Sequence, residues 1–306
     1  MFLQYLSTLP GAIALGLIWG LMAIGVYITY KILDIPDLTV DGSFATGGIV
    51  AVVLITSGVH FILAILIAFL AGLLCGLLTG ILHAILGIPP ILSGILTQLA
   101  LWSINLKISN GRSNIALNVR KYDLIFTQQN NVDTLWKMLI VLAILIVIIY
   151  IFFGTELGAS IRATGNNPKM SKAQGINTKR NIVLGLAISN GIVALAGALL
   201  AQYQCFADVN MGRGAIVIGL CAVVIGGAIF SKIARNFALR LFAVVFGGVL
   251  YYIIFQSVVF LGVDTNLLKM LAAIIVAIFL GIPYLKRHHW NKIKRIINNR
   301  KLLRES

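Results

Sequence analysis

A run of polar residues, IPDLTVDGSF at positions 35–44, interrupts the apolar sequence on either side of it. Its two carboxylates, Asp37 and Asp41, could bind the ammonium group of a small solute, and Phe44 could stack on an aromatic ring. Because the run also holds a proline and a glycine that disfavour a regular helix, we predict polar backbone that lines a pathway or a gate. A solvated loop between two membrane spans is the alternative interpretation.

A second group of polar residues lies at positions 87–105, in GIPPILSGILTQLALWSIN. Pro89, Pro90 and Gly94 are expected to break the helix here, and broken helices often mark the substrate region of transporters. A bent structural helix is the alternative interpretation. The candidate pathway residues from the two groups are Asp37, Thr39, Asp41, Ser43, Phe44 and Gln98.

No sequence motif points to catalysis. The chain has only nine Asp and Glu residues, and its sequence holds no HExxH, GxSxG or Walker A motif. We therefore expect no enzymatic activity, and no cofactor or metal in this chain. Cys75, Cys205 and Cys221 fall in or at the ends of apolar segments without a CxxC pair, so they are expected to be small buried hydrophobic residues.

A short polar and basic segment, SIRATGNNPKMSKAQGI at positions 160–176, separates two long apolar runs and carries helix boundary signals. Asn167 can cap a helix through its side-chain oxygen, and Pro168 suits the first helical position because its missing N–H costs nothing there. Gly175 suits the left-handed residue that ends a helix, and Asn177 can cap the next span. The segment therefore predicts a defined helix over residues 165–176 in a loop between spans.

This predicted helix has the composition of a docking element. Met170, Ala173 and Ile176 form one apolar edge, and lysine and arginine residues flank it, as expected of a knob for a protein groove with acidic edges. An ordinary connecting loop and a helix lying on lipid are the alternatives. The candidate docking residues are Arg162, Gly165, Asn167, Pro168, Lys169, Met170, Lys172, Ala173, Gly175 and Ile176.

Membrane helices must position these segments. The 306 residues are 59% hydrophobic and 11% charged, with a mean hydropathy of +0.99, and a helix needs about 20 apolar residues to cross a bilayer. Because backbone in lipid must satisfy its own hydrogen bonds, we predict an all-α polytopic membrane bundle of eight or nine segments. The long runs are 9–31, 60–86, 137–153, 182–205, 237–260 and 266–284, and the shorter ones are 42–57, 88–106 and 212–230. Residues 42–57 and 88–105 are the candidates for re-entrant segments.

Residues 1–285 are expected to form one transmembrane domain, followed by a basic tail at 286–306. The net charge is +15, and 13 of the 24 basic residues lie in this tail and in the 156–181 loop. Lysine and arginine concentrate in cytoplasmic loops, so both regions are predicted to be cytoplasmic. A basic tail beside a final span favours contact with anionic membrane lipid over a nucleic-acid partner. Glycines spaced by four, such as Gly72 and Gly76, predict close helix packing.

Taken together, these segments resemble a known family. SIRATGNNPKMSKAQGINTKRNIVLGLAISNGIVALAGALLAQY is similar to the cytoplasmic coupling region and following helix of ABC importer permeases for branched-chain amino acids, ribose and simple sugars. MGRGAIVIGLCAVVIGGAIF resembles the family's glycine-rich segment, and GLIWGLMAIGVYITYKIL resembles its N-terminal region. The resemblance covers most of residues 10–285. PDLTVDGSF departs from the break typical of branched-chain permeases and resembles the subgroup of tryptophan or tyrosine transport permeases.

This resemblance implies a multi-pass permease of the bacterial plasma membrane that pairs with a second copy or a homologue. Two cytoplasmic ABC ATPase subunits would bind residues 168–174 and hold the ATP and Mg²⁺, and an extracytoplasmic substrate-binding lipoprotein would deliver the solute. The resemblance also implies import, with an aromatic amino acid such as tryptophan or tyrosine as the expected solute. A nucleoside or a simple sugar is the close alternative.

Two other classes of protein compete with this interpretation. A secondary transporter would carry coupling protons on acids inside the membrane, and the six long predicted spans contain almost none. A membrane enzyme would need a clustered acid–base set, which the sequence does not show.

Overall fold

The computed structural model describes residues 2–118, 121–122, 124–126, 131–230 and 236–262, with isolated positions between 270 and 281. In this part of the chain seven helical segments are long and apolar enough to cross a membrane. They are α1 (Phe2–Tyr27) with its π-type continuation η1 (Ile28–Ile32), α2 (Thr39–Thr56), α3 (Phe61–Gly80) with η2 (Ile81–Ile85), α4 (Pro90–Ile108), α5 (Asn131–Gly154), α8 (Thr178–Gln204) and α10 (Phe237–Phe260). The predicted polytopic helical fold is therefore confirmed.

Three further helices complete the described part. The apolar helix α9 (Ala215–Phe230) is too short to be counted as a span, in agreement with the shorter run that we predicted there. The polar helices α6 (Glu156–Asn166) and α7 (Pro168–Ala173) lie together between α5 and α8. The predicted span 266–284 falls almost entirely outside the described residues, and the basic tail falls wholly outside them.

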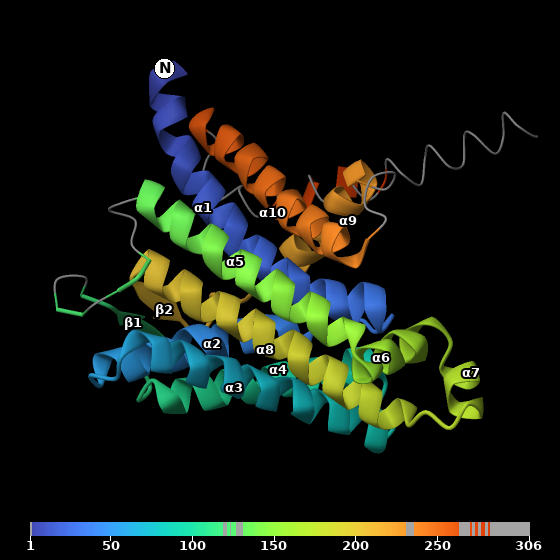
Figure 1. Cartoon of the computed structure of the whole chain (residues 1–306). Helices are drawn as coiled ribbons and strands as arrows, with labels where there is room; N and C mark the ends of the chain where they lie inside the picture. The colour runs from blue at the N-terminus through green and yellow to red at the C-terminus, as the bar shows by residue number, and fades with distance from the viewer. Residues whose placement is uncertain are drawn as a thin grey trace, which may run out of the picture.

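The bundle has two distinct ends (Figure 1). At one end lie α6 and α7, which we call the α7 end. Toward the other lies a short antiparallel pair of strands, β1 (Asn114–Ala116) and β2 (Phe206–Asp208), which we call the β end. Since α8 starts directly after α7 and runs into β2, the two ends mark opposite faces of the bundle.

Glycines let the long helices pack closely, as predicted. A Cβ added to Gly72 or Gly76 on α3 would overlap backbone carbonyl oxygens of α8, so α3 and α8 touch backbone to backbone. Gly16 and Gly20 on α1 face Val249 and Val245 on α10 in the same way. Such contacts are the usual means of close helix packing in lipid.

Two predictions about helix breaks were wrong. Pro89 is the N-cap residue of α4 and Pro90 its first residue, so the prolines lie at the non-helical break between η2 and α4 and do not interrupt α4 itself, because a proline in the first turn loses no intrahelical hydrogen bond. Gly94 lies inside this continuous helix, where its missing side chain leaves room for the Leu38 backbone. Likewise Gly42 lies in the first turns of α2, and only residues 34–37, which include Pro36, lack regular structure.

Candidate functional site

Two helices start inside the bundle and meet at Asp41. This residue lies in the first turn of α2, and its carboxylate faces the start of α9. One carboxylate oxygen accepts a hydrogen bond from the Gly214 backbone N–H and the other from the Ile216 N–H, both at 2.9 Å. A carboxylate is well suited to this position, because the first N–H groups of a helix have no intrahelical partners and carry partial positive charge. Asp41 therefore joins α2 to α9.

A second carboxylate, which is buried, lies just before α2. Asp37 is 3% exposed; one oxygen accepts from the Thr39 backbone N–H at 2.9 Å and the other from the Asn190 side-chain amide at 2.7 Å. The Asn190 carbonyl oxygen in turn accepts from the Ser43 hydroxyl at 2.6 Å. Because Asn190 lies near the middle of α8, these contacts place the start of α2 deep in the bundle.

Threonine hydroxyls extend this network to two more helices. Thr39 and Thr79 share a hydrogen bond of 2.7 Å, and Thr79 donates to Thr97 at 3.0 Å. All three side chains are buried. We call the whole set the polar junction; its members are Asp37, Thr39, Asp41, Ser43, Thr79, Thr97 and Asn190.

The remaining two candidate pathway residues lie beside the polar junction. Phe44 is fully buried and stacks on Trp19 of α1 at a centroid distance of 5.0 Å. Gln98 is half-buried on α4, next to Gly42 of α2. The structure thus brings together Asp37, Thr39 and Ser43: the Thr39 N–H donates to Asp37, the Ser43 hydroxyl lies within hydrogen-bonding distance of the Thr39 carbonyl, and Asn190 bridges Asp37 and Ser43. Phe44 and Gln98 lie against other helices.

The sequence interpretation missed Asn190 and Thr79, although a lone amide in an apolar span is a signal that could have been used. It also missed Asn105 on α4 and Gln202 on α8. Both amide side chains are fully buried, and their polar atoms have no hydrogen-bond partner in the described residues. Buried amides normally find a partner, so these two side chains depart from the usual pattern.

The segment between α5 and α8 shows the predicted boundary signals. The Asn167 side chain accepts from the Met170 N–H at 3.0 Å and caps α7, which starts at Pro168. Gly175 has φ +79°, the left-handed conformation expected of the residue after a helix. The Asn177 side chain accepts from the Arg180 N–H at 3.1 Å and caps α8. We call residues 167–177 the α7 turn.

The helix is shorter than predicted, because the segment holds two helices instead of one. Gly165 belongs to α6, where a Cβ would overlap the Ile32 carbonyl oxygen of η1, and α7 is a six-residue helix. The Asn181 side chain of α8 donates to the hydroxyls of Ser160 at 2.6 Å and Thr164 at 2.9 Å. Helix α6 is thus fixed to η1 and to α8, and it carries the α7 turn outward.

Helix α7 presents an apolar side chain at the end of the bundle. Met170 is 57% exposed, its neighbours Lys169 and Lys172 are exposed, and Ala173 is exposed on the same edge. Ile176 is half-buried, so the apolar edge faces solvent at Met170 and Ala173. This arrangement offers an apolar knob with positive charge beside it.

Comparison with known proteins identifies a family. Residues 9–282 match the family described as branched-chain amino acid transport system / permease component. The chain is 38% identical over 265 residues to the tyrosine transport system permease protein of Clostridioides difficile, which covers 87% of this chain and 88% of that one. It is 34% identical over 269 residues to an uncharacterized protein of Rickettsia prowazekii, covering 87% and 93% of the two chains.

A more distant relative transports a different kind of solute. The fructose import permease protein of Bifidobacterium longum is 28% identical over 256 residues, which cover 83% of this chain and 71% of that one. No solved structure gives a significant match to the chain.

Proposed function

The chain belongs to the permease family of branched-chain amino acid transport systems, and we propose that it is the membrane subunit of an ATP-driven importer of a small solute. The observation that carries this proposal is the α7 turn, a capped and exposed helix that is fixed to the bundle by α6. Such a helix is suited to a groove on a separate ATPase subunit. The residues proposed for this contact are Arg162, Gly165, Asn167, Pro168, Lys169, Met170, Lys172, Ala173, Gly175 and Ile176.

Two routes connect the α7 turn with the polar junction, one through a packing contact and one along the chain. One runs through the contact of Gly165 with Ile32 of η1, which leads directly into the segment that holds Asp37. The other runs along α8, which starts at the α7 turn and carries Asn190. We propose that a movement of α7 on ATP binding reaches the polar junction by these routes and changes which side of the membrane is open. The solute and the ATPase must each bind the two states with different affinity for this to work.

An aromatic amino acid such as tyrosine or tryptophan is the proposed solute. The support is the 38% identity to a tyrosine transport permease, against 28% to a fructose permease. The proposed pathway residues are Asp37, Thr39, Asp41, Ser43, Phe44 and Gln98. Because both carboxylates already accept hydrogen bonds from the chain, a solute ammonium would bind them in a conformation in which some of these bonds open. A nucleoside or a simple sugar remains the alternative solute.

The partners follow from this assignment. Two ABC ATPases with bound ATP and Mg²⁺ would dock at the α7 end, so we place this end and the basic tail in the cytoplasm of a bacterial cell. A substrate-binding lipoprotein would dock at the β end, and a second permease copy or a homologue would complete the complex. The chain itself is proposed to hydrolyse nothing and to bind no nucleic acid.

Affinity purification of the tagged protein from its native membranes tests the proposal. We expect an ATPase with Walker motifs to be recovered with the wild-type chain and to be lost from Met170→Asp. Since Met170 is exposed, this substitution should leave the fold intact. The matched control is Phe206→Asp at the β end, another exposed apolar residue, which should keep the ATPase. Failure of the folded wild-type protein to recover any ATPase would refute the importer assignment.

A further inference from the structure

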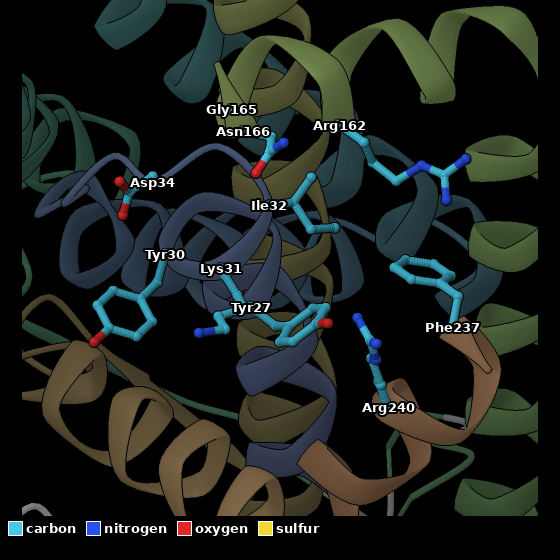
Figure 2. A pocket seen from close by; sticks show the side chains of 10 residues that line it. All are labelled: Tyr27, Tyr30, Lys31, Ile32, Asp34, Arg162, Gly165, Asn166, Phe237 and Arg240. Atoms are coloured by element: carbon cyan, nitrogen blue, oxygen red, sulfur yellow. The ribbon is translucent and has the colours of Figure 1, made fainter. Parts of the chain in front are cut away.

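A basic cavity lies at the α7 end, beside the α7 turn but separate from the polar junction. It has a volume of about 660 Å³ and lies between η1, α6 and α10 (Figure 2). Its described lining includes three cations, Lys31, Arg162 and Arg240, against one carboxylate, Asp34. In Figure 2 the Arg240 side chain extends toward Tyr27, to which it is hydrogen-bonded. We call this cavity the basic chamber.

Two of the three cations are available to a ligand. Within the described residues, neither the Lys31 side chain nor the Arg162 side chain forms a hydrogen bond or an ion pair, and both residues are exposed. Two cations without side-chain partners in the lining of one cavity, one from η1 and one from α6, favour an anionic occupant, because each can donate charge-assisted hydrogen bonds.

A second cavity adjoins the first and is mostly apolar. It has a volume of about 340 Å³ and shares Tyr27, Lys31 and Arg240 with the basic chamber. The rest of its wall comes from α9 and α10: Val223, Gly226, Gly227, Phe230, Ala243 and Val244. A Cβ added to Gly227 would meet no atom of the described residues within 4 Å, so this glycine faces open space in that part of the chain. We call this cavity the apolar chamber.

We propose that the two chambers together bind an anionic phospholipid, with the phosphate in the basic chamber and an acyl chain in the apolar chamber. Their position supports this, because Lys31 lies at the end of one apolar span and Arg240 at the start of another. Aromatic and basic residues at the ends of spans usually lie at the level of the lipid head groups. Basic pockets between membrane helices are known to take anionic lipid head groups.

A transported amino acid fits the chambers less well. It would bring an ammonium group into a chamber with three cations and one carboxylate, and it would fill only part of two adjoining cavities of about 660 and 340 Å³. A phospholipid instead provides one phosphate and long apolar chains. The inference does not depend on the proposed importer function, since it concerns lipid bound by the permease alone.

Native mass spectrometry of the intact detergent-extracted protein tests the basic chamber. The probes are palmitoyl-oleoyl phosphatidylglycerol and phosphatidylcholine with the same chains. We expect the wild type to prefer phosphatidylglycerol and the double variant Lys31→Gln, Arg162→Gln to lose up to about thirtyfold in affinity for it, because each basic residue near an anionic lipid contributes roughly fivefold. The matched control Lys107→Gln, Arg112→Gln removes two exposed cations elsewhere in the chain and should keep the preference.

Equal binding of both lipids by the wild type, or an unchanged preference in the double variant, would overturn the proposal. Displacement of phosphatidylglycerol by millimolar tyrosine or by inorganic phosphate would assign the basic chamber to a soluble anion instead of a lipid.

A substitution that keeps all charges tests the apolar chamber. Gly227→Leu places a side chain in open space on α9, and leucine favours a helix over glycine, so the fold should be kept. We expect weaker binding of the long-chain phosphatidylglycerol and unchanged binding of the dihexanoyl form, whose chains are too short to fill the chamber. Equal binding of the long-chain lipid by the variant and the wild type would show that the acyl chain does not occupy the apolar chamber.

Discussion

In the α7 turn the hydrogen bonds that define the helix join residues three to five positions apart, whereas in the polar junction they join residues as far as 175 positions apart. Asn167 caps α7 through Met170, and the Ile176 N–H donates to the Ser171 carbonyl. Asp41, by contrast, holds the start of α9. The α7 turn is therefore a local structure on the surface of the fold, whereas the polar junction connects helices that are far apart in the sequence and stabilises the bundle.

The largest effect is expected at Asp41. Asp41→Ala leaves the N–H groups of Gly214 and Ile216 without their acceptors, so we expect the free energy of unfolding to fall by about 3 kcal/mol. Asp41→Asn keeps one acceptor oxygen and should lose less. Thermal unfolding of the detergent-solubilised protein measures both, with the exposed Asp34→Asn as the control. If Asp41→Ala melted at the same temperature as the wild type, the hydrogen bonds of Asp41 would not stabilise the fold.

A smaller loss of stability is expected from a substitution at the contact between α2 and α8. A Cβ at Gly47 would overlap the Ala194 carbonyl, so Gly47→Ala should force the two helices apart and cost about 1–3 kcal/mol. Gly154→Ala is the matched control, because its Cβ would meet no atom within 4 Å. Thermal unfolding should separate the two variants, and identical melting temperatures would contradict the close approach of α2 to α8.

A substitution in the α7 turn should destabilise only the α7 turn itself. Asn167→Ala removes the helix cap and is expected to cost α7 about 1 kcal/mol. Amide hydrogen exchange should become faster in residues 169–176, while the melting temperature of the bundle stays unchanged. A lower melting temperature would show that the α7 turn is coupled to the stability of the bundle and would weaken the comparison.

The smallest effect is expected in the threonine chain. Thr97→Val removes the acceptor of the 3.0 Å bond from Thr79, and hydrogen bonds between membrane helices contribute about 0.6 kcal/mol on average. Thr56→Val, which removes a hydroxyl bonded within α2, provides a comparison inside one helix. Unfolding in a denaturing detergent should show a small loss for Thr97→Val, and a loss as large as that of Asp41→Ala would contradict this ranking.

The sequence separation between hydrogen-bonded residues also explains which features the sequence could predict. The caps at Asn167 and Asn177 and the end at Gly175 are confirmed because each depends on neighbours within a few residues. Seven of the nine predicted membrane segments are confirmed as helices long and apolar enough to cross a membrane, because apolar runs of about 20 residues are visible in any sequence. Asn190 was missed because its importance comes from Asp37, which lies 153 positions earlier.

The wrong predictions have a similar cause. Sequence patterns treat proline and glycine as helix breakers, yet the effect of these residues on a helix depends on their position in it and on the neighbouring helix. Pro90 stands at the start of α4, where it costs nothing. Gly42 stands where α4 approaches α2, so it permits packing against Gln98 instead of ending the helix. Only the tertiary structure distinguishes these roles.

ATP-driven uptake of a solute is the decisive test of whether the α7 turn couples ATP binding by a separate ATPase to a conformational change of the bundle. The measurement is uptake of labelled tyrosine into proteoliposomes that hold the co-purified complex, with ATP supplied on the ATPase side. We predict uptake that requires ATP, that persists without an ion gradient and that is lost in Met170→Asp but not in Met170→Leu, which keeps an exposed apolar side chain on α7. Tyrosine uptake that follows an ion gradient without ATP, and that Met170→Asp leaves unchanged, would contradict the account.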